Sequence, residues 1–245
     1  MILLLVESIQ LMDRIVSHVK FNVNPDLFLK DPESSSIGKR ILMEAINILD
    51  QSGFERLTFK ELAHTAQTTE STVYRYFENK HMLILYLSNW YWSWLFYRLQ
   101  LGLTNIPSGK KKLAKAIEIL CRQSEDDNLI AHIDLVKLAH LIHLESGKIF
   151  RVRDVDQENK QGFYLPYKLL HEKMKNIILE VKETFPFAES LAASIIQGIH
   201  QQHFNYEHFP TLTSMTNTEK DIENYFLNLS LAYLSTPQTS FCNGK

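Results

Sequence analysis

The sequence predicts an all-α protein, and three observations lead to that fold class. Apolar residues recur at steps of three and four along most of the 245 residues, which is the spacing of a helical face. With 8 Gly and 7 Pro, the chain has little material for the turns of a β architecture. Breakers fall between the periodic stretches, where helices should end, at Pro107, Gly162, Pro186 and Pro210.

Composition leaves the class of partner open. The chain is 45% hydrophobic, which is ordinary for a globular protein. Its 26 Lys and Arg are balanced by 28 Asp and Glu, so net charge neither indicates nor excludes a nucleic-acid partner. Two distant cysteines, Cys121 and Cys242, favour a reduced, cytoplasmic compartment. No run of about 18 apolar residues occurs, so we expect no membrane span.

Residues 1–35 are predicted to form an N-terminal extension. An apolar stripe at helical spacing predicts a helix over residues 2–23, formed by Ile2, Leu5, Ile9, Met12, Val16, Val19 and Val23. We expect this helix to dock on the body of the protein, with a partner or a membrane surface as the alternative. Pro25 and the stretch DPESSS then indicate a connector over residues 24–35.

A first amphipathic helix and a short second helix are predicted from residue 36. Ser36 is placed to cap the first helix, and Gly53 supplies the left-handed residue that ends it. The stretch TFKE, from Thr58 to Glu61, has the pattern of a capping box and predicts a short helix beginning near Phe59.

A second short helix and a long helix follow. Thr69 is placed to cap a helix running to about Phe77, and Asn79 can cap a long helix that begins at Lys80. Two short helices joined by a tight turn and braced by a longer one form a helix-turn-helix arrangement. Residues 36–83 are therefore predicted to be a three-helix DNA-binding head.

The second short helix carries the candidate DNA contacts. Val73 and Phe77 supply its inward edge, which leaves hydroxyls, tyrosines and an arginine for a major groove and the neighbouring phosphates. The predicted contacts with bases and nearby phosphates are Ser71, Thr72, Arg75 and Tyr76, with Thr69 as the cap. The predicted contacts with the phosphate backbone are Thr58, Tyr74 and Lys80.

Residues 37–83 resemble the DNA-binding head of the TetR family of bacterial transcriptional regulators. The matching positions are Gly53, Thr58, Leu62, Ala63, Ala66, Thr69, Tyr74, Phe77, Lys80 and Leu83. Gln67 stands where the family has a turn glycine, and Tyr76 where it has a histidine. The resemblance implies a ligand-responsive regulator, a repressor that binds a near-palindromic double-stranded DNA operator as a homodimer.

Residues 84–245 are predicted to form a helical effector-binding and dimerisation domain. Helices are expected near residues 110–123, 130–150, 163–183, 187–206 and 219–235. The resemblance implies a cavity for an unknown small molecule, with Trp90, Trp94, Tyr97, His140 and His143 as candidates; core packing is the alternative for the aromatics. It also implies a dimer interface on the last two helices, at Leu191, Ala192, Ile195, Gly198, Ile199, Ile222, Phe226, Leu229 and Tyr233.

No catalytic motif stands out, so neither an enzyme nor a cofactor is expected. Helical histidine pairs such as His200 and His203 have metal-binding spacing, but no carboxylate accompanies them at ligand spacing, and no metal site is predicted. Two alternatives remain. The head holds six Lys/Arg and six Asp/Glu, which favours a helical interaction or small-molecule binding module with weakened DNA affinity. A metal-assisted enzyme using the histidines is the third hypothesis.

Overall fold

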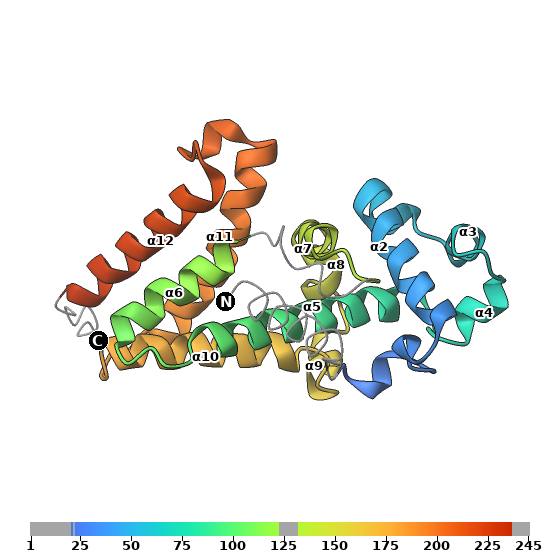
Figure 1. Ribbon diagram of the computed structural model, residues 1–245, viewed down its shortest axis with the longest axis horizontal. Coiled ribbons are helices and arrows are strands. Elements are labelled where there is room, and N and C mark those ends of the chain that lie inside the picture. The colour runs from blue at the N-terminus through green and yellow to red at the C-terminus, as the bar shows by residue number, and fades with distance from the viewer. Residues whose placement is uncertain (1–20, 22, 123–131, 237–245) are drawn as a thin grey trace, which may run out of the picture. The chain divides into compact units, whose positions relative to one another are not determined.

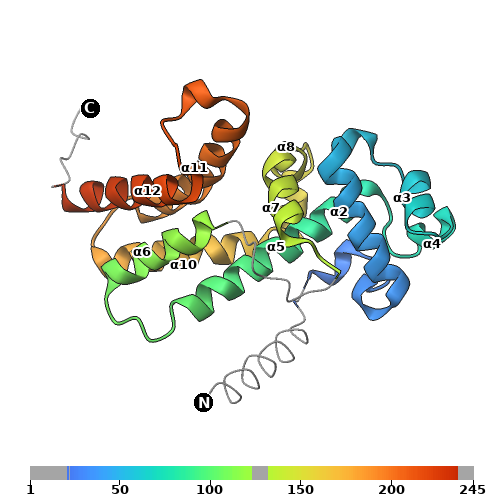
Figure 2. The same ribbon diagram turned by 45° about the horizontal axis from the view of Figure 1, so that its top comes forward.

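The structure is a computed structural model that describes Phe21, residues 23–122 and residues 132–236. All regular secondary structure in these residues is helical, which confirms the predicted fold class (Figures 1 and 2). The contacts divide the chain into two compact units. The first is Met1–Phe96 with Gln123–Lys168, and the second is Tyr97–Arg122 with Leu169–Lys245. The predicted helix over residues 2–23 lies outside the described residues except at its end.

The head of the first unit contains the predicted three helices, preceded by two short 3-10 helices. Their bounds are η1 (Pro25–Leu27), η2 (Pro32–Ser34), α2 (Ser36–Arg56), α3 (Phe59–Thr65) and α4 (Glu70–Tyr74). Ser35, not Ser36, caps α2, because its hydroxyl accepts the amide of Gly38. Gly53 has the predicted positive φ of +75°, but α2 kinks there and resumes for a short stretch.

The predicted caps of the later head helices are confirmed. The Thr58 hydroxyl accepts from the Glu61 amide at 3.2 Å, and the Thr69 hydroxyl accepts from the Thr72 amide at 3.3 Å. Gln67 has a φ of +50° in the turn between α3 and α4. A residue with a Cβ is strained in this region, and the family's glycine would not be. The turn therefore forms despite the substitution.

The connector is part of the packed head rather than a loose link. Leu27 is fully buried, and the Leu29 amide donates to the Tyr76 carbonyl at 2.8 Å. A Cβ added at Gly38 would clash with the Pro32 backbone, so η2 lies directly against the first turn of α2. The connector thereby contributes to the core beneath α4.

The remainder of the first unit is built on the long helix that begins at Lys80, where the Asn79 side chain accepts the amides of His81 and Met82. Its further helices are α5 (Lys80–Gly102), α7 (Leu135–Leu144), α8 (Ser146–Phe150) and α9 (Val155–Lys160), followed by the start of α10 (Leu165–Val181). The predicted helix over residues 130–150 is interrupted at Glu145, so it is two helices. The sequence analysis missed α9, whose VDQENK stretch has almost no apolar face.

The second unit is also helical. It contains α6 (Gly109–Cys121), α11 (Ala188–His208), η3 (Pro210–Leu212) and α12 (Thr218–Ser235), with the ends of α5 and α10. Helix α12 packs on α6 and α11. Gly198 on α11 lets the Phe226 ring of α12 approach closely, since an added Cβ would lie 2.5 Å from Phe226 Cζ. Across the described residues, no helix combines the length and apolarity that a bilayer span requires.

Candidate nucleic-acid interface

Helix α4 is anchored by its apolar side and presents its polar side to solvent. Val73 and Phe77 are fully buried, as predicted. Ser71 and Arg75 are exposed, and Tyr74 is 49% exposed with its ring packed edge-on against Phe59. A short helix held from behind in this way exposes the side chains that a DNA groove requires.

A cluster of hydroxyls forms at the beginning of α4. Thr69 Oγ1 lies 2.9 Å from both Ser71 Oγ and Thr72 Oγ1, in addition to accepting the Thr72 amide. These contacts fix the rotamers of all three side chains. Because hydroxyls both donate and accept, the cluster can bind either a phosphate oxygen or a base edge.

Tyr76 is not on the exposed face, so its predicted contact with bases or phosphates is wrong. Its side chain is fully buried, and its hydroxyl lies 2.7 Å from Ser35 Oγ. The prediction assumed a helix continuing to Phe77, whereas α4 ends at Tyr74. Beyond that point the helical spacing no longer applies, and Tyr76 and Phe77 both face the core. Tyr76 therefore anchors α4 and does not read DNA.

Lys80 makes contacts within the head that the sequence did not predict. Its ammonium group donates to the carbonyls of Phe54 and Glu55, at 3.0 and 3.3 Å, and lies 4.5 Å from the centre of the Phe54 ring. These carbonyls belong to the end of α2, where a cation is favoured by the helix dipole. The geometry thus gives Lys80 a structural role in the head, and its predicted contact with phosphate stays a prediction.

The exposed side chains around α4 are mixed in charge. Lys60 and Arg75 are exposed there, but so are Glu61, Glu70 and Glu78. The balance within residues 36–83 is therefore also found close to the recognition helix. Counterion release from DNA scales with the number of phosphates neutralised, so this surface predicts a modest salt dependence.

A polar seam joins α2 to the residues of α7 and α8, and the sequence analysis did not identify it. Lys137 Nζ donates to Asn47 Oδ1 at 2.8 Å, and the Glu145 carboxylate accepts the Phe54 amide at 2.7 Å. Lys148 also pairs with Glu55. The spacing of 137, 145 and 148 places these side chains along one side of α7 and α8, but no sequence pattern shows which helix that side meets.

Two candidates for the effector pocket take part in polar contacts within the first unit. His140 Nδ1 lies 2.7 Å from Asp50 Oδ1, within the polar seam between α2 and α7. His143 Nε2 lies 3.4 Å from the Tyr91 hydroxyl. Both histidines thus have assigned contacts with neighbouring helices, and their predicted contact with an effector stays a prediction.

The aromatic candidates are largely core residues. Trp90 and Trp94 are buried, and the Trp90 indole N–H donates to Glu33 at 3.3 Å. Tyr91 packs against Trp94, with ring centroids 5.8 Å apart. Tyr97, which belongs to the second unit, is half-buried. These positions agree with core packing, the alternative weighed for the aromatics, and the effector cavity they were expected to line remains untested.

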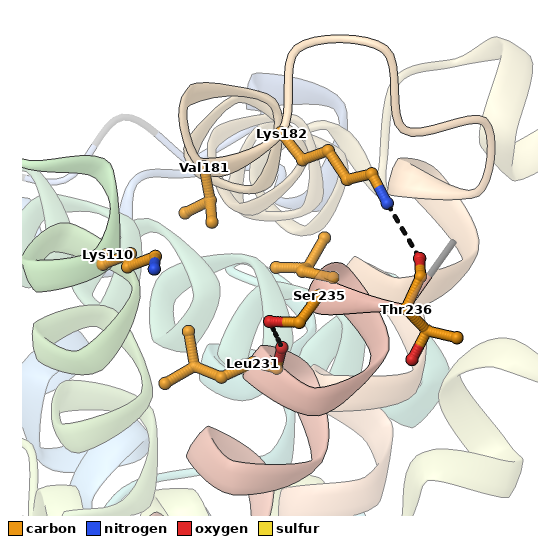
Figure 3. A pocket seen from close by; sticks show the side chains of 7 residues that line it. Lys110, Val181, Lys182, Leu231, Ser235 and Thr236 are labelled. Atoms are coloured by element: carbon orange, nitrogen blue, oxygen red, sulfur yellow. Dashed lines mark hydrogen bonds between the residues drawn. The ribbon is translucent and has the colours of Figure 1, made fainter. Parts of the chain in front are cut away.

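A cavity of about 370 Å³ lies in the second unit, between the start of α6 and the ends of α10 and α12 (Figure 3). Its lining residues are Lys110, Val181, Lys182, Leu231, Leu234, Ser235 and Thr236. None of the five candidate pocket residues lines it. Lys182 faces the end of α12 and donates to the Thr236 carbonyl at 3.1 Å.

The predicted dimer interface is largely an intramolecular contact. Six of its nine residues are buried within the chain: Leu191, Ala192, Ile195, Ile199, Ile222 and Phe226. A seventh, Gly198, lies against Phe226. The assignments of the six buried residues are therefore wrong, because α11 and α12 use their most apolar faces to pack on each other and on α6, while that of Gly198 stays a prediction. Leu229 and Tyr233 remain exposed, one and two turns after the exposed Tyr225.

Three histidines of the second unit, His171 on α10 and His200 and His203 on α11, are partly or fully buried. Burial lowers the pKa of His171 to about 4, and burial together with the nearby His203 and His171 lowers that of His200 to about 3. Burial also lowers the pKa of His203, whose Nε2 lies 3.1 Å from the Cys121 carbonyl. The imidazoles are therefore neutral near pH 7.

A helix-turn-helix head with a capped, polar recognition helix on an all-helical body defines a class of DNA-binding regulators. Residues 41–87 match the family model for bacterial regulatory proteins of the tetR family. The resemblance to the TetR family of bacterial transcriptional regulators is thus confirmed. No curated protein matches the chain.

Solved structures share the fold at low sequence identity. A tetR-family regulatory protein from Rhodococcus RHA1 has a TM-score of 0.62 at 14% identity, covering 83% of this chain and 100% of that one. The fatty acid degradation regulator FadR from Bacillus halodurans has a TM-score of 0.59 at 15% identity, covering 79% and 95%. AibR, solved with isovaleryl coenzyme A and operator DNA, has a TM-score of 0.56 at 13% identity, covering 78% and 97%.

Proposed function

We propose that the protein is a ligand-responsive transcriptional regulator that binds double-stranded DNA through α4. The observation that carries the proposal is the exposed face of Ser71, Tyr74 and Arg75, held by a buried Val73 in a head that matches the tetR family. Thr69 and Thr72 extend the face with fixed hydroxyls. Thr58 lies at the exposed start of α3, where it can contact the DNA backbone.

The mode of regulation follows from the same proposal. We expect a repressor that binds as a homodimer, so that two copies of α4 reach a near-palindromic operator with half-sites roughly 34 Å apart. The structural similarity to AibR, which was solved with operator DNA, supports a DNA partner. On α12, the exposed Tyr225, Leu229 and Tyr233 make the apolar surface that would be buried in the dimer.

A small molecule is the proposed effector, bound within the helical body. AibR was solved with isovaleryl coenzyme A, which supports a ligand of this general kind without identifying it. Trp94, Tyr97 and His143 remain the residues to test for contact with such a ligand. An effector that binds the folded state should raise the Tm in proportion to the logarithm of its concentration above the Kd.

One observation favours a second candidate function. Glu61, Glu70 and Glu78 offset the basic residues around α4, and the Lys80 ammonium is bound to the end of α2. A head with so few available cations would serve an interaction or small-molecule binding module with weakened affinity for DNA. The two functions differ in their salt dependence, because phosphate contacts release counterions.

Fluorescence anisotropy with the DNA upstream of the protein's own gene tests the proposal, with an unrelated duplex beside it. Arg75→Ala should lose about 1 to 3 kcal/mol of binding free energy if this side chain reads a guanine. Arg153→Ala is the matched control, because Arg153 is also exposed but lies outside the head. Binding by Arg75→Ala equal to the parent, with no salt slope in either, would favour the interaction module.

A further inference from the structure

Three histidine–carboxylate pairs join two segments of the first unit that are far apart in sequence. We define the head segment as residues 24–82 and the middle segment as residues 132–168. His132 Nε2 lies 3.0 Å from Glu33 Oε1, His140 Nδ1 lies 2.7 Å from Asp50 Oδ1, and His81 Nε2 lies 2.6 Å from Glu158 Oε1. Each pair has one member in each segment.

The pairs lie at three separate places along the head segment. Glu33 is in η2, Asp50 is near the end of α2, and His81 is in the first turn of α5. In the first two pairs the imidazole belongs to the middle segment, whereas in the third pair, His81–Glu158, it belongs to the head segment. Because the three pairs lie on different elements of the head segment, they restrict its movement against the middle segment at three points.

We propose that these three pairs make the attachment of the head segment to the middle segment depend on pH. A protonated imidazole beside a carboxylate forms a charge-assisted hydrogen bond, whereas a neutral imidazole keeps only the weaker neutral one. Histidine is the side chain whose charge ordinarily changes between about pH 5 and pH 8. The attachment is therefore tighter in mildly acidic than in mildly alkaline solution.

Limited solvent access gives the charges their effect. None of the six side chains is more than 32% exposed, and Glu158 is only 8% exposed. Screening by water and salt is weaker at such sites than at a fully exposed ion pair. A change in the charge of each imidazole therefore changes the strength of its interaction with the partner carboxylate.

Other polar groups contact two of the three carboxylates, Glu33 and Glu158. The Trp90 indole donates to the same Glu33 oxygen that His132 contacts, and the Tyr86 hydroxyl interacts electrostatically with both Glu33 and Asp31. The Tyr164 hydroxyl contacts the other oxygen of Glu158.

Lysines lie near two of the pairs. Beside His140, Lys137 is held by Asn47 and lies 3.7 Å from Asp134. Next to His81 in sequence, the Lys80 ammonium is bound to the carbonyls at the end of α2. These cations are therefore directed to other partners, and the imidazoles face the carboxylates.

Amide hydrogen exchange of the full chain at about pH 6 and pH 8, normalised to intrinsic rates, tests the proposal without DNA. Peptides covering residues 44–56 and 133–145 should exchange about threefold to tenfold faster at pH 8, because three weakened pairs act together. Peptides covering the interior of α3 are an internal control and should not change.

Variants identify the source of the effect. Gln keeps a neutral donor, so the triple variant His81→Gln, His132→Gln, His140→Gln should exchange at both pH values as the parent does at pH 8. His64→Gln is the matched control, because His64 is exposed on α3 and takes part in none of the pairs. An unchanged pH ratio in the triple variant, or no pH effect in the parent, overturns the proposal. A corresponding pH dependence of DNA affinity rests on the proposed function and is measured separately.

Discussion

At the scale of single residues, the head shows that aromatic and cationic side chains beside a recognition helix need not contact DNA. Tyr74 and Tyr76 are two positions apart, yet the first is half exposed and the second is fully buried. The Lys80 ammonium likewise donates to backbone carbonyls at the end of α2. The exposed surface of α4 that can contact DNA is therefore smaller than the sequence predicts, and Arg75 is its principal cation.

Tyr76→Phe separates support of α4 from contact with DNA. The change removes the hydroxyl bonded to Ser35 and should lower the free energy of unfolding by about 0.5 to 1.5 kcal/mol. Urea denaturation measures this loss, and Tyr74→Phe, at an exposed site, is the control expected to leave the unfolding midpoint within error. A stability equal to that of the parent would show that the Ser35 contact contributes nothing. Affinity of the folded variant for DNA should match that of the parent.

At the scale of helices, close approach of α11 and α12 depends on the absence of one side chain. The Phe226 ring occupies the space where a Cβ on residue 198 would be, and Ile195 and Ile199 are buried on either side along α11. The packing of α12 on α11 in the second unit therefore depends on this glycine.

Gly198→Ala should destabilise the protein by about 1 to 3 kcal/mol, because overpacking forces the helices or the ring to shift. Gly147→Ala is the matched control. A Cβ there meets nothing within 4 Å, and alanine favours helix over glycine, so this variant should be unchanged or up to about 1 kcal/mol more stable. Thermal unfolding measures both. A stable Gly198→Ala variant would mean that Phe226 relaxes without cost, and restoration of the Tm in Gly198→Ala, Phe226→Leu would confirm the clash.

Most helices were predictable because their ends carry local signals. Thr58, Thr69 and Asn79 are caps whose hydrogen bonds involve neighbours within three residues, so sequence spacing alone identifies them. The partners of His140 and Glu145 lie about ninety positions away, and no local pattern encodes them. For the same reason, the apolar face of α11 predicted a contact but not whether it lies within one chain or between two.

At the scale of the whole molecule, assembly must use a surface that the fold leaves exposed. Tyr225, Leu229 and Tyr233 recur every four residues on α12 and are 39 to 47% exposed. An apolar stripe of this kind, rather than the buried face of α11, is the surface available for a second copy under the proposed function.

Leu229→Lys combined with Tyr233→Lys should convert a dimer into a folded monomer, as measured by sedimentation velocity with circular dichroism. Leu212→Lys is the control, because Leu212 is 67% exposed in η3, away from the stripe. Ile195→Lys should instead unfold the protein, since it places a charge in the interior. If the double variant sediments as the parent does, the stripe on α12 does not form the dimer.

The packing of the connector against the head has a practical consequence for dividing the chain into fragments. A fragment beginning at Ser36 contains every residue of the helix-turn-helix, but it lacks Leu27, the Leu29 amide that donates to Tyr76, and the Ser35 cap of α2. Such a fragment would expose the underside of α4 to water. A protease that cuts ahead of Pro25 would leave the head intact, whereas one that cuts at Ser34 would release a head with an open core.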